Sequence, residues 1–244
     1  MIQNIGLAVL AVVTLGVVVF ALTAPPSAQP SASEQVRNYT PPTQEPVKVV
    51  PVAVIGDSYS AGTGAGDKSQ SWVGRLAFNQ AWNVTNAARG GTGYVRSVSA
   101  DALKACGLDY CPSYPEMIND VVAANPEIVI VAGGRNDSRY PEADEAAAIQ
   151  SFYEKLQAAL PSAKIVAFNA WWDSTAPPAS IPAMSAAIKS SVESVGGTYI
   201  DAGQPLGSRP ELITTDGVHP NPAGHKALFE AALAKLQAAG LATS

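Results

Sequence analysis

The sequence predicts an α/β protein built on a doubly wound sheet of five parallel strands. Three observations predict this class. Short apolar, β-branched runs alternate along the chain with longer segments of helical spacing, and prolines and glycines separate the two kinds of segment. The polar motifs of the chain follow directly after the apolar runs, which is where open parallel sheets carry their ligand loops.

The first expected strand, at 47–55, is almost continuously apolar, which is typical of a strand buried on both faces. The remaining strands are expected at 83–88, 127–132, 163–169 and 198–201. Helices are expected at 71–78, 115–125, 142–160, 182–195 and 221–240. Pro115 and Pro222 stand at first helical positions, and Gly196-Gly197 ends the fourth helix. The acidic residues of the third helix gather in its first turn, where the helix dipole favours them.

The composition narrows the classes of function. The 244 residues carry a formal net charge of -5, and no segment gathers basic residues, which argues against a nucleic-acid partner. With 47% hydrophobic residues, the chain can form one sizeable core and a membrane segment besides. We expect the core to belong to a single domain at 47–244.

The segment Ile5–Ala24 contains no charged residue and is long enough to span a bilayer as a helix. It lacks the basic start and the small-residue cleavage site of a signal peptide, so residues 1–24 favour an uncleaved membrane anchor over a signal peptide. Residues 25–46 contain six prolines and predict a stiff, extended linker. We therefore expect an extracytoplasmic, membrane-anchored domain, or a secreted one if the segment is cleaved.

Cys106 and Cys111 are the two cysteines of the chain. They are too few for a zinc site of thiolates, and no histidine lies near them in the sequence. An exported domain would allow them to form a disulfide across a short loop. Two reduced thiols are the alternative.

Ser58 follows the first strand within Gly56-Asp57-Ser58-Tyr59-Ser60 and precedes a glycine-rich stretch. A serine at this place can be a nucleophile or a helix N-cap. The nucleophile needs a base, and Asp216 and His219, three residues apart, supply a carboxylate and an imidazole, although such a pair can also stand in a plain loop. These residues predict a serine-dependent acyl hydrolase. No G-x-S-x-G motif occurs, which argues against a nucleophile elbow.

Two further loops follow strands. Asn86–Gly93 offers backbone N–H groups beside glycines, and Asn136 offers a side-chain amide that can donate to an oxyanion. The alternatives are a flexible loop for the first segment and an ordinary turn residue for the second. The other histidine, His225, lies at the start of the last helix, and we assign it to packing or to the surface.

Four segments, those around Ser58, Gly91, Asn136 and His219, resemble in their order and spacing the GDSL, or SGNH, hydrolase family. The resemblance extends from about Val52 to Gly224. The resemblance implies a flavodoxin-like, three-layer α/β/α fold. It also implies a triad of Ser58, Asp216 and His219 and an oxyanion hole formed by the N–H groups of Ser58 and Gly91 and the side chain of Asn136. Gly90 and Gly93 compete with Gly91 for this role. At Arg135 many relatives carry a small or hydroxyl residue, so we expect a cation facing the cleft.

The expected reaction is hydrolysis of a carboxylic ester on an extracytoplasmic lipid or acylated glycan. The alternatives are an acyltransferase that delivers the acyl group to a sugar or lipid hydroxyl and a non-catalytic domain that binds the cell envelope. Trp171, Trp172 and Asp173 follow the fourth strand and are candidates for the substrate pocket, with a core position as the alternative for one tryptophan. We expect a monomer without metal or organic cofactor that meets the membrane only through its N-terminal segment.

Overall fold

A computed structural model describes residues 48–243, and its core is one sheet of five parallel strands. The strands are β1 (Val50–Gly56), β2 (Trp82–Asn86), β3 (Ile128–Ala132), β4 (Lys164–Phe168) and β5 (Thr198–Ile200). They lie in the order β2-β1-β3-β4-β5, which is the order of flavodoxin-like folds. The predicted fold class is confirmed. The segments 1–24 and 25–46 lie outside the described residues.

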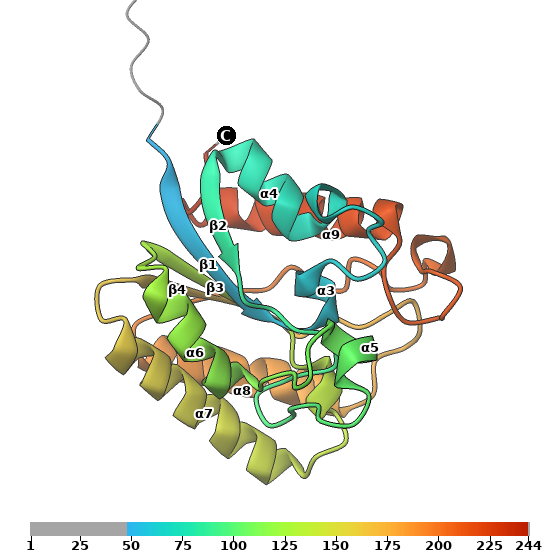
Figure 1. Cartoon of the computed structure of the whole chain (residues 1–244), viewed down its shortest axis with the longest axis horizontal. Coiled ribbons are helices and arrows are strands. Elements are labelled where there is room, and N and C mark those ends of the chain that lie inside the picture. Colours follow the sequence, from blue (N-terminus) through green and yellow to red (C-terminus); the bar gives the residue numbers. More distant parts are fainter. Residues whose placement is uncertain (1–47, 244) are drawn as a thin grey trace, which may run out of the picture. The chain divides into compact units, whose positions relative to one another are not determined.

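The helices form a layer on each face of the sheet (Figure 1). The helices are α3 (Ser58–Ala61), α4 (Trp72–Gln80), α5 (Ala102–Cys106), α6 (Tyr114–Ala123), α7 (Glu142–Ala159), α8 (Ser180–Ser194) and α9 (Pro222–Ala238). Helices α4 and α9 pack on one face, and α6, α7 and α8 pack on the other. Three short 3₁₀ turns complete the described chain: η1 (Lys68–Gln70), η2 (Arg135–Asp137) and η3 (Pro210–Leu212).

The burial of β1 on both of its faces explains why its sequence is apolar at nearly every position. Val52 and Val54 face the core under α4 and α9, whereas Ala53 and Ile55 face the core over α6, α7 and α8. Because alternate residues of a strand point to opposite faces, a strand covered on both sides must be apolar throughout. The strand pairs with β2 on one side and with β3 on the other.

Side-chain caps explain the helix boundaries that the sequence predicts. Asn221 caps α9 by accepting hydrogen bonds from the N–H groups of Ala223 and Gly224, and Pro222 is its first residue. Ser113 and Glu116 form a capping box at the start of α6, so Tyr114 is its first residue and Pro115 its second, one position later than expected. The short helices α3 and α5 were not expected from the sequence.

The sheet has two ends, which we call its poles: one at the amino ends and one at the carboxyl ends of its parallel strands. They differ in the residues that they carry. The described chain enters at Lys48, next to the amino end of β1, and Thr243 is held at the same pole by hydrogen bonds with Gln80 at the end of α4 (Figure 1). The loops that carry the polar motifs leave the carboxyl ends of the strands at the opposite pole. A chemical site is expected at this second pole, in the crevice beyond the carboxyl ends of β1 and β3, where the strand order reverses.

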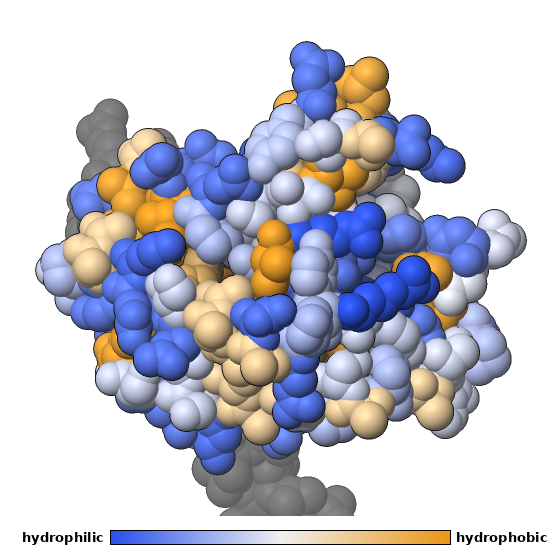
Figure 2. Space-filling view, turned by 90° about the horizontal axis from the view of Figure 1, so that it is seen from below, coloured by the Kyte–Doolittle hydropathy of each residue, from blue (hydrophilic) through white to orange (hydrophobic). Residues whose placement is uncertain are grey.

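The outer faces of the helices that lie below the sheet in Figure 1 are mixed in character. Figure 2 shows polar and apolar side chains interspersed there rather than one continuous apolar surface. Within residues 48–243, no helix has both the length and the apolar character that crossing a membrane requires. The expected anchor, Ile5–Ala24, lies outside this range.

Candidate active site

Ser58 is the first residue of α3, and only Asp57 separates it from the end of β1. Asp57 caps α3, since its carboxylate accepts the N–H of Tyr59 at 3.0 Å, so the interpretation of Ser58 as the N-cap is wrong. Burial raises the pKa of Asp57 to about 6, although the Tyr59 N–H and the nearby Arg135 favour its charged form. Ser58 is itself 5% exposed and lies beside the cavity described below.

The glycine-rich loop after β2 is fixed in place. The side chain of Asn86 donates to the Ser60 carbonyl at 2.8 Å and accepts the N–H of Ala88 at 3.0 Å. Gly91 has a φ of +78°, which strongly favours glycine. At Gly90 a Cβ would lie 2.0 Å from the Ala105 carbonyl oxygen and 3.8 Å from the Ser58 Cβ. The loop can therefore pack against the Ala105 carbonyl of α5 only because Gly90 carries no side chain.

Gly90 and Gly91 line the same cavity as Ser58, and Gly93 does not. The N–H of Gly93 donates to the Arg96 carbonyl at 2.9 Å, and a side chain there would collide with the carboxylate of Asp137. The structure thus removes Gly93 from the three glycines considered as backbone donors.

Turn η2 ties the Asn136 amide to the glycine-rich loop. The Nδ2 of Asn136 donates to the Thr92 carbonyl at 2.9 Å. An amide nitrogen carries two hydrogens, so one remains for a second acceptor. The neighbouring Asp137 accepts the backbone N–H groups of Tyr94, Val95 and Arg96, at 2.6, 3.3 and 3.0 Å. These bonds hold the two loops together.

Asp216 and His219 lie in the loop between η3 and α9. The Oδ2 of Asp216 lies 2.7 Å from the Nδ1 of His219, and its Oδ1 accepts from the side chain of Thr214 and from the N–H groups of Val218 and His219. Burial opposes the charge of Asp216, but these hydrogen bonds outweigh it and hold its pKa well below the usual range. Asp216 therefore stays ionised, and it holds the imidazole with Nδ1 toward itself.

These segments enclose a cavity of about 410 Å³. One side, which we call the strand-end wall, consists of Ser58, Gly90, Gly91 and Asn136, at the ends of β1, β2 and β3. The facing side, which we call the loop wall, is the segment 214–220, from which Val218 and His219 line the cavity. Among the described residues, Ser58 Oγ and His219 Nε2 share this cavity without a direct hydrogen bond. In structures without substrate such bonds are often long or poorly aligned.

Helix α5 forms the third side of the cavity, through Asp101, Lys104 and Ala105. A disulfide between Cys106 and Cys111 closes the loop that follows it, and Cys111 also pairs with Val98 in a short antiparallel bridge. The expected pairing is thus present in the structure. It fastens the end of α5 beside the cavity.

A larger hollow of about 620 Å³ lies at the other edge of the sheet, beside β5. It is lined by Lys189, Glu193 and Tyr199, among others, and contains none of the residues of the two walls. The smaller cavity is the better candidate because it brings together a hydroxyl, an imidazole and amide donors, which are the groups that acyl transfer requires. Within residues 48–243, no three side chains of the metal-ligating types are grouped closely enough to hold a metal ion.

The two adjacent tryptophans have different environments. Trp171 is buried in the core and packs edge-on against Trp72 with ring centroids 5.2 Å apart, so its expected place in the substrate pocket is wrong and the core alternative is right. Trp172 is half-buried and does not line the cavity, but its ring lies 4.3 Å from the guanidinium carbon of Arg135. Arg135 does line the cavity, as expected, although its charge is paired with Asp173.

His225 is fully buried in the first turn of α9, with Nε2 3.0 Å from the Thr63 carbonyl oxygen. Burial lowers its pKa. This is a packing position, as expected. No motif indicated a role for Tyr59, which lies next to Ser58 and yet bonds to Val218, 159 residues further along the chain.

Comparison with known sequences matches residues 54–227 to the GDSL-like Lipase/Acylhydrolase family. The curated GDSL lipase Rv0518 of Mycobacterium tuberculosis is 31% identical over 202 residues, which are 80% of this chain and 84% of that protein. The family match includes all the segments that form the two walls of the cavity.

Comparison with solved structures agrees on the fold. The structure of TesA superimposes with a TM-score of 0.58 at 23% identity and covers 77% of this chain and 98% of that one. The salicylyl-acyltransferase SsfX3 from a tetracycline biosynthetic pathway gives a TM-score of 0.60 at 17% identity, over 81% of this chain and 57% of that one. At these identities the likeness concerns the fold alone.

Proposed function

Because the chain belongs to the GDSL-like lipase/acylhydrolase family, we propose that it hydrolyses carboxylic esters through an acyl-enzyme formed on Ser58. The observation that carries this proposal is that His219, whose Nδ1 lies 2.7 Å from Asp216, lines the same cavity as Ser58 and Asn136. With Nδ1 turned to the carboxylate, Nε2 is the nitrogen that remains to take the serine proton.

In the first half of the reaction, His219 Nε2 removes the proton of Ser58 as Oγ attacks the ester carbonyl. The carbonyl π electrons move onto its oxygen, and the negative Asp216 stabilises the imidazolium that forms. Collapse of the tetrahedral intermediate breaks the bond to the alcohol oxygen, which takes the proton from His219. The alcohol leaves and the acyl group stays on Ser58.

The strand-end wall supplies the donors for the oxyanion. These are the N–H of Ser58, the N–H of Gly91 and the second hydrogen of the Asn136 amide. The bond from Asn136 to the Thr92 carbonyl supports this role, because it fixes which end of the amide is nitrogen and which way it points. In the second half, water attacks the acyl-enzyme with His219 as its base, and the acid and free Ser58 are released.

We place the substrate outside the cytoplasm and expect it to be a lipid ester or an acylated glycan. The apolar segment Ile5–Ala24, the proline-rich linker and the pairing of Cys106 with Cys111 support this placement. Membrane fractionation tests it: the protein should stay with membranes in high salt and give no free thiols on labelling. A soluble form lacking the first residues would instead indicate a cleaved signal peptide.

The experiment that tests the function is hydrolysis of p-nitrophenyl acetate by the wild type and by Ser58→Ala. We expect a loss of about 10⁴-fold or more, together with an acetyl group on Ser58 in trapped wild-type protein. Equal activity of the two proteins, or no activity in either, would refute the proposal and favour a binding domain. Transfer of acetyl to an added sugar or glycerol in preference to water would identify an acyltransferase.

A further inference from the structure

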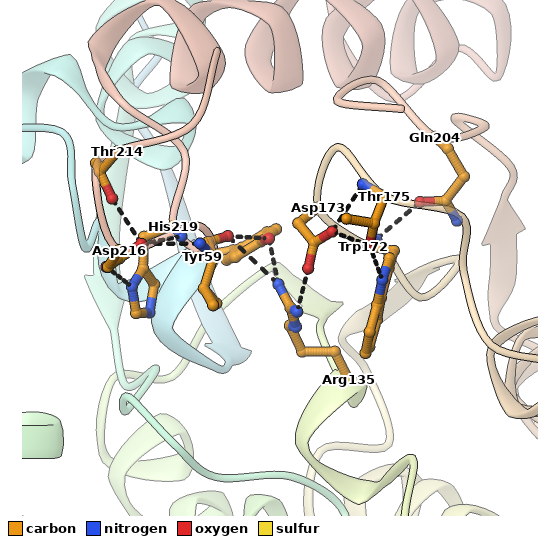
Figure 3. A network of polar contacts seen from close by, with 10 residues as sticks. Tyr59, Arg135, Trp172, Asp173, Thr175, Gln204, Thr214, Asp216 and His219 are labelled. Atoms are coloured by element: carbon orange, nitrogen blue, oxygen red, sulfur yellow. Dashed lines mark hydrogen bonds and ion pairs between the residues drawn. The ribbon is translucent and has the colours of Figure 1, made fainter. Parts of the chain in front are cut away.

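Arg135 occupies an unusual position for a cation beside a cavity. Its side chain is only 8% exposed, and its Nη2 donates to Asp173 Oδ2 at 2.9 Å. Its Nη1 donates to the hydroxyl of Tyr59 and reaches the Val218 carbonyl oxygen at 3.5 Å. Figure 3 shows the guanidinium pointing between Asp173 and Tyr59, with Trp172 alongside. A charge that is already paired in this way is poorly suited to binding an anionic substrate group.

The partners of Arg135 on the β4 side are themselves fixed. Asp173 accepts the N–H and the hydroxyl of Thr175 through Oδ1. The backbone N–H of Trp172 donates to Gln204 at 2.7 Å, and its indole N–H donates to Thr175 at 3.0 Å. The ring of Trp172 stacks on the guanidinium, a contact that favours arginine over lysine. Asp173 and Trp172 therefore fix the position of the Arg135 side chain independently of its bonds to the loop wall.

Tyr59 connects this anchor to the loop wall. Its side chain is buried, and its hydroxyl accepts from Arg135 and donates to the Val218 carbonyl at 2.6 Å. Burial raises the pKa of Tyr59, so the hydroxyl keeps its proton and remains a donor. Its ring also meets the imidazole of His219 edge-on, with centroids 6.3 Å apart.

The bonds at the Val218 carbonyl differ in kind from the others in the loop wall. The bonds of Asp216, and the bond from the Thr214 N–H to the His219 carbonyl, lie within the segment 214–220 and fix its shape. The bonds from Tyr59 in α3 and Arg135 in η2 come from outside this segment, after the ends of β1 and β3, and fix where this shape lies relative to Ser58. Val218 directly precedes His219, so a shift of its carbonyl moves the imidazole.

We propose that Arg135 and Tyr59 are positioning residues, which hold the Val218 carbonyl and thereby set the distance of His219 from Ser58. This inference rests on the proposed function. Misplacing a catalytic group by about 1 Å can lower the rate about 100-fold. We expect the loss to appear in kcat, because neither side chain needs to touch the substrate.

The test uses p-nitrophenyl acetate, a neutral substrate, with Tyr59→Phe, Arg135→Gln and the double variant. We expect kcat to fall about 10-fold in Tyr59→Phe and about 10- to 100-fold in Arg135→Gln, with KM changed less than about threefold. The double variant should be no slower than Arg135→Gln, because both changes act through one carbonyl. If the kcat losses of the two single variants add up in the double variant, the inference that both residues act through the Val218 carbonyl is refuted.

Controls separate positioning from damage to the fold. Tyr153→Phe also removes a buried tyrosine hydroxyl, one that bonds to Tyr94 in the core on the other face of the sheet, and it should leave kcat unchanged. Arg135→Gln leaves the carboxylate of Asp173 buried without its cation, which is destabilising. The combination Arg135→Gln with Asp173→Asn removes that charge and should restore the melting temperature without restoring kcat.

A second readout does not depend on turnover. The chain contains two histidines, so ¹⁵N-labelled histidine gives two sets of ring signals, which His219→Ala assigns. Arg135→Gln and Tyr59→Phe should shift or broaden the signals of His219 and leave those of His225 in place. Unchanged His219 signals would refute the inference even if the wild type proves inactive and the proposed function fails.

Two further outcomes are informative. If Ser58→Ala is inactive but Tyr59→Phe and Arg135→Gln match the wild type, the positioning is refuted and the proposed function stands. If Arg135→Gln raises KM for a succinyl monoester and leaves the acetyl ester unaffected, Arg135 binds the substrate and the positioning role is wrong.

Discussion

The strand-end wall and the loop wall of the cavity are built in different ways. Ser58, Gly90 and Asn136 follow the ends of three strands that are hydrogen-bonded neighbours in the sheet. The loop wall does not follow a strand directly, because η3 separates it from β5; it is closed on itself by a bridge between Ile213 and Pro220 and by the bonds of Asp216. The first wall is therefore positioned by the fold as a whole, whereas the second takes its shape from a few local bonds. Changes in the first should cost stability as well as activity, whereas changes in the second should cost activity alone.

The largest expected effect lies in the loop wall. His219→Ala should lower kcat/KM for p-nitrophenyl acetate by about 10⁴-fold or more, because it removes the base. The imidazole is 25% exposed and belongs to a loop, so the melting temperature should stay within about 2 °C of the wild type. Paired kinetic and thermal measurements check this. A large drop in melting temperature would mean that the loop wall is part of the cooperative fold.

Asn136→Ala tests the strand-end wall. We expect kcat to fall about 100-fold, as for the loss of one oxyanion donor. The variant also loses the bond to the Thr92 carbonyl, so its free energy of unfolding should fall by about 1 kcal/mol. Steady-state kinetics and urea titration measure the two effects. A loss confined to KM would identify Asn136 as a ground-state binding group.

Gly90→Ala should disturb the same wall through packing. The new Cβ would meet the Ala105 carbonyl oxygen at 2.0 Å, so the glycine-rich loop and α5 must move apart. We expect a loss of about 2 kcal/mol in unfolding free energy, together with reduced activity. Gly207→Ala is the matched control: its new Cβ would lie 3.3 Å from the Gln204 carbonyl oxygen, a contact that a much smaller shift relieves, so the loss of stability should be much smaller than in Gly90→Ala. If Gly90→Ala loses activity at full stability, the two walls do not differ as described.

The smallest expected effect lies outside the cavity, in α7. Glu145 is 2% exposed, and burial together with Asp137 and Glu142 raises its pKa to about 7. A raised pKa means that the folded state favours the protonated form of Glu145 more than the unfolded state does. The stability that comes with protonation is therefore complete below about pH 4.5 and is lost as the pH rises through 7. Glu145→Gln should therefore be more stable than the wild type at pH 8, by about 1–2 kcal/mol, and not at pH 4.5.

Thermal melts at the two pH values check this prediction. Glu154→Gln, an exposed position on the same helix, should show no such difference. An equal gain for Glu145→Gln at both pH values would exclude ionisation as the cause.

The fold was largely predictable because the signals are local. The apolar run at β1 indicates a buried strand, and Asn221-Pro222 indicates a capped helix start at α9. Both signals lie within a few residues of the sequence. Helix α5 was not predictable, because it has five residues and its N-cap, Asp101, makes no side-chain capping bond. Short helices form where tertiary contacts hold them rather than where propensity favours them.

The candidate site was predictable in its polar loops but not in its supports. Motifs at strand ends pointed to Ser58 and Asn136, since parallel strands bring their carboxyl ends to one edge. The spacing of Asp216 and His219 before the last helix pointed to the base. No local pattern distinguishes Trp171 from Trp172, because both follow the end of β4 and only the tertiary structure places one in the core. The bond from Tyr59 to Val218 joins residues 159 positions apart and has no signal in the sequence of either.

The position at which the described chain enters the domain has a consequence for orientation. Lys48 lies at the amino end of β1 and Ser58 follows its carboxyl end, and the seven residues of the strand rise about 23 Å. All strands are parallel, so the cavity beside Ser58 lies at the opposite end of the sheet from Lys48. A group attached directly to Lys48 would therefore lie at the end of the sheet that lacks the polar motifs, the length of β1 away from Ser58.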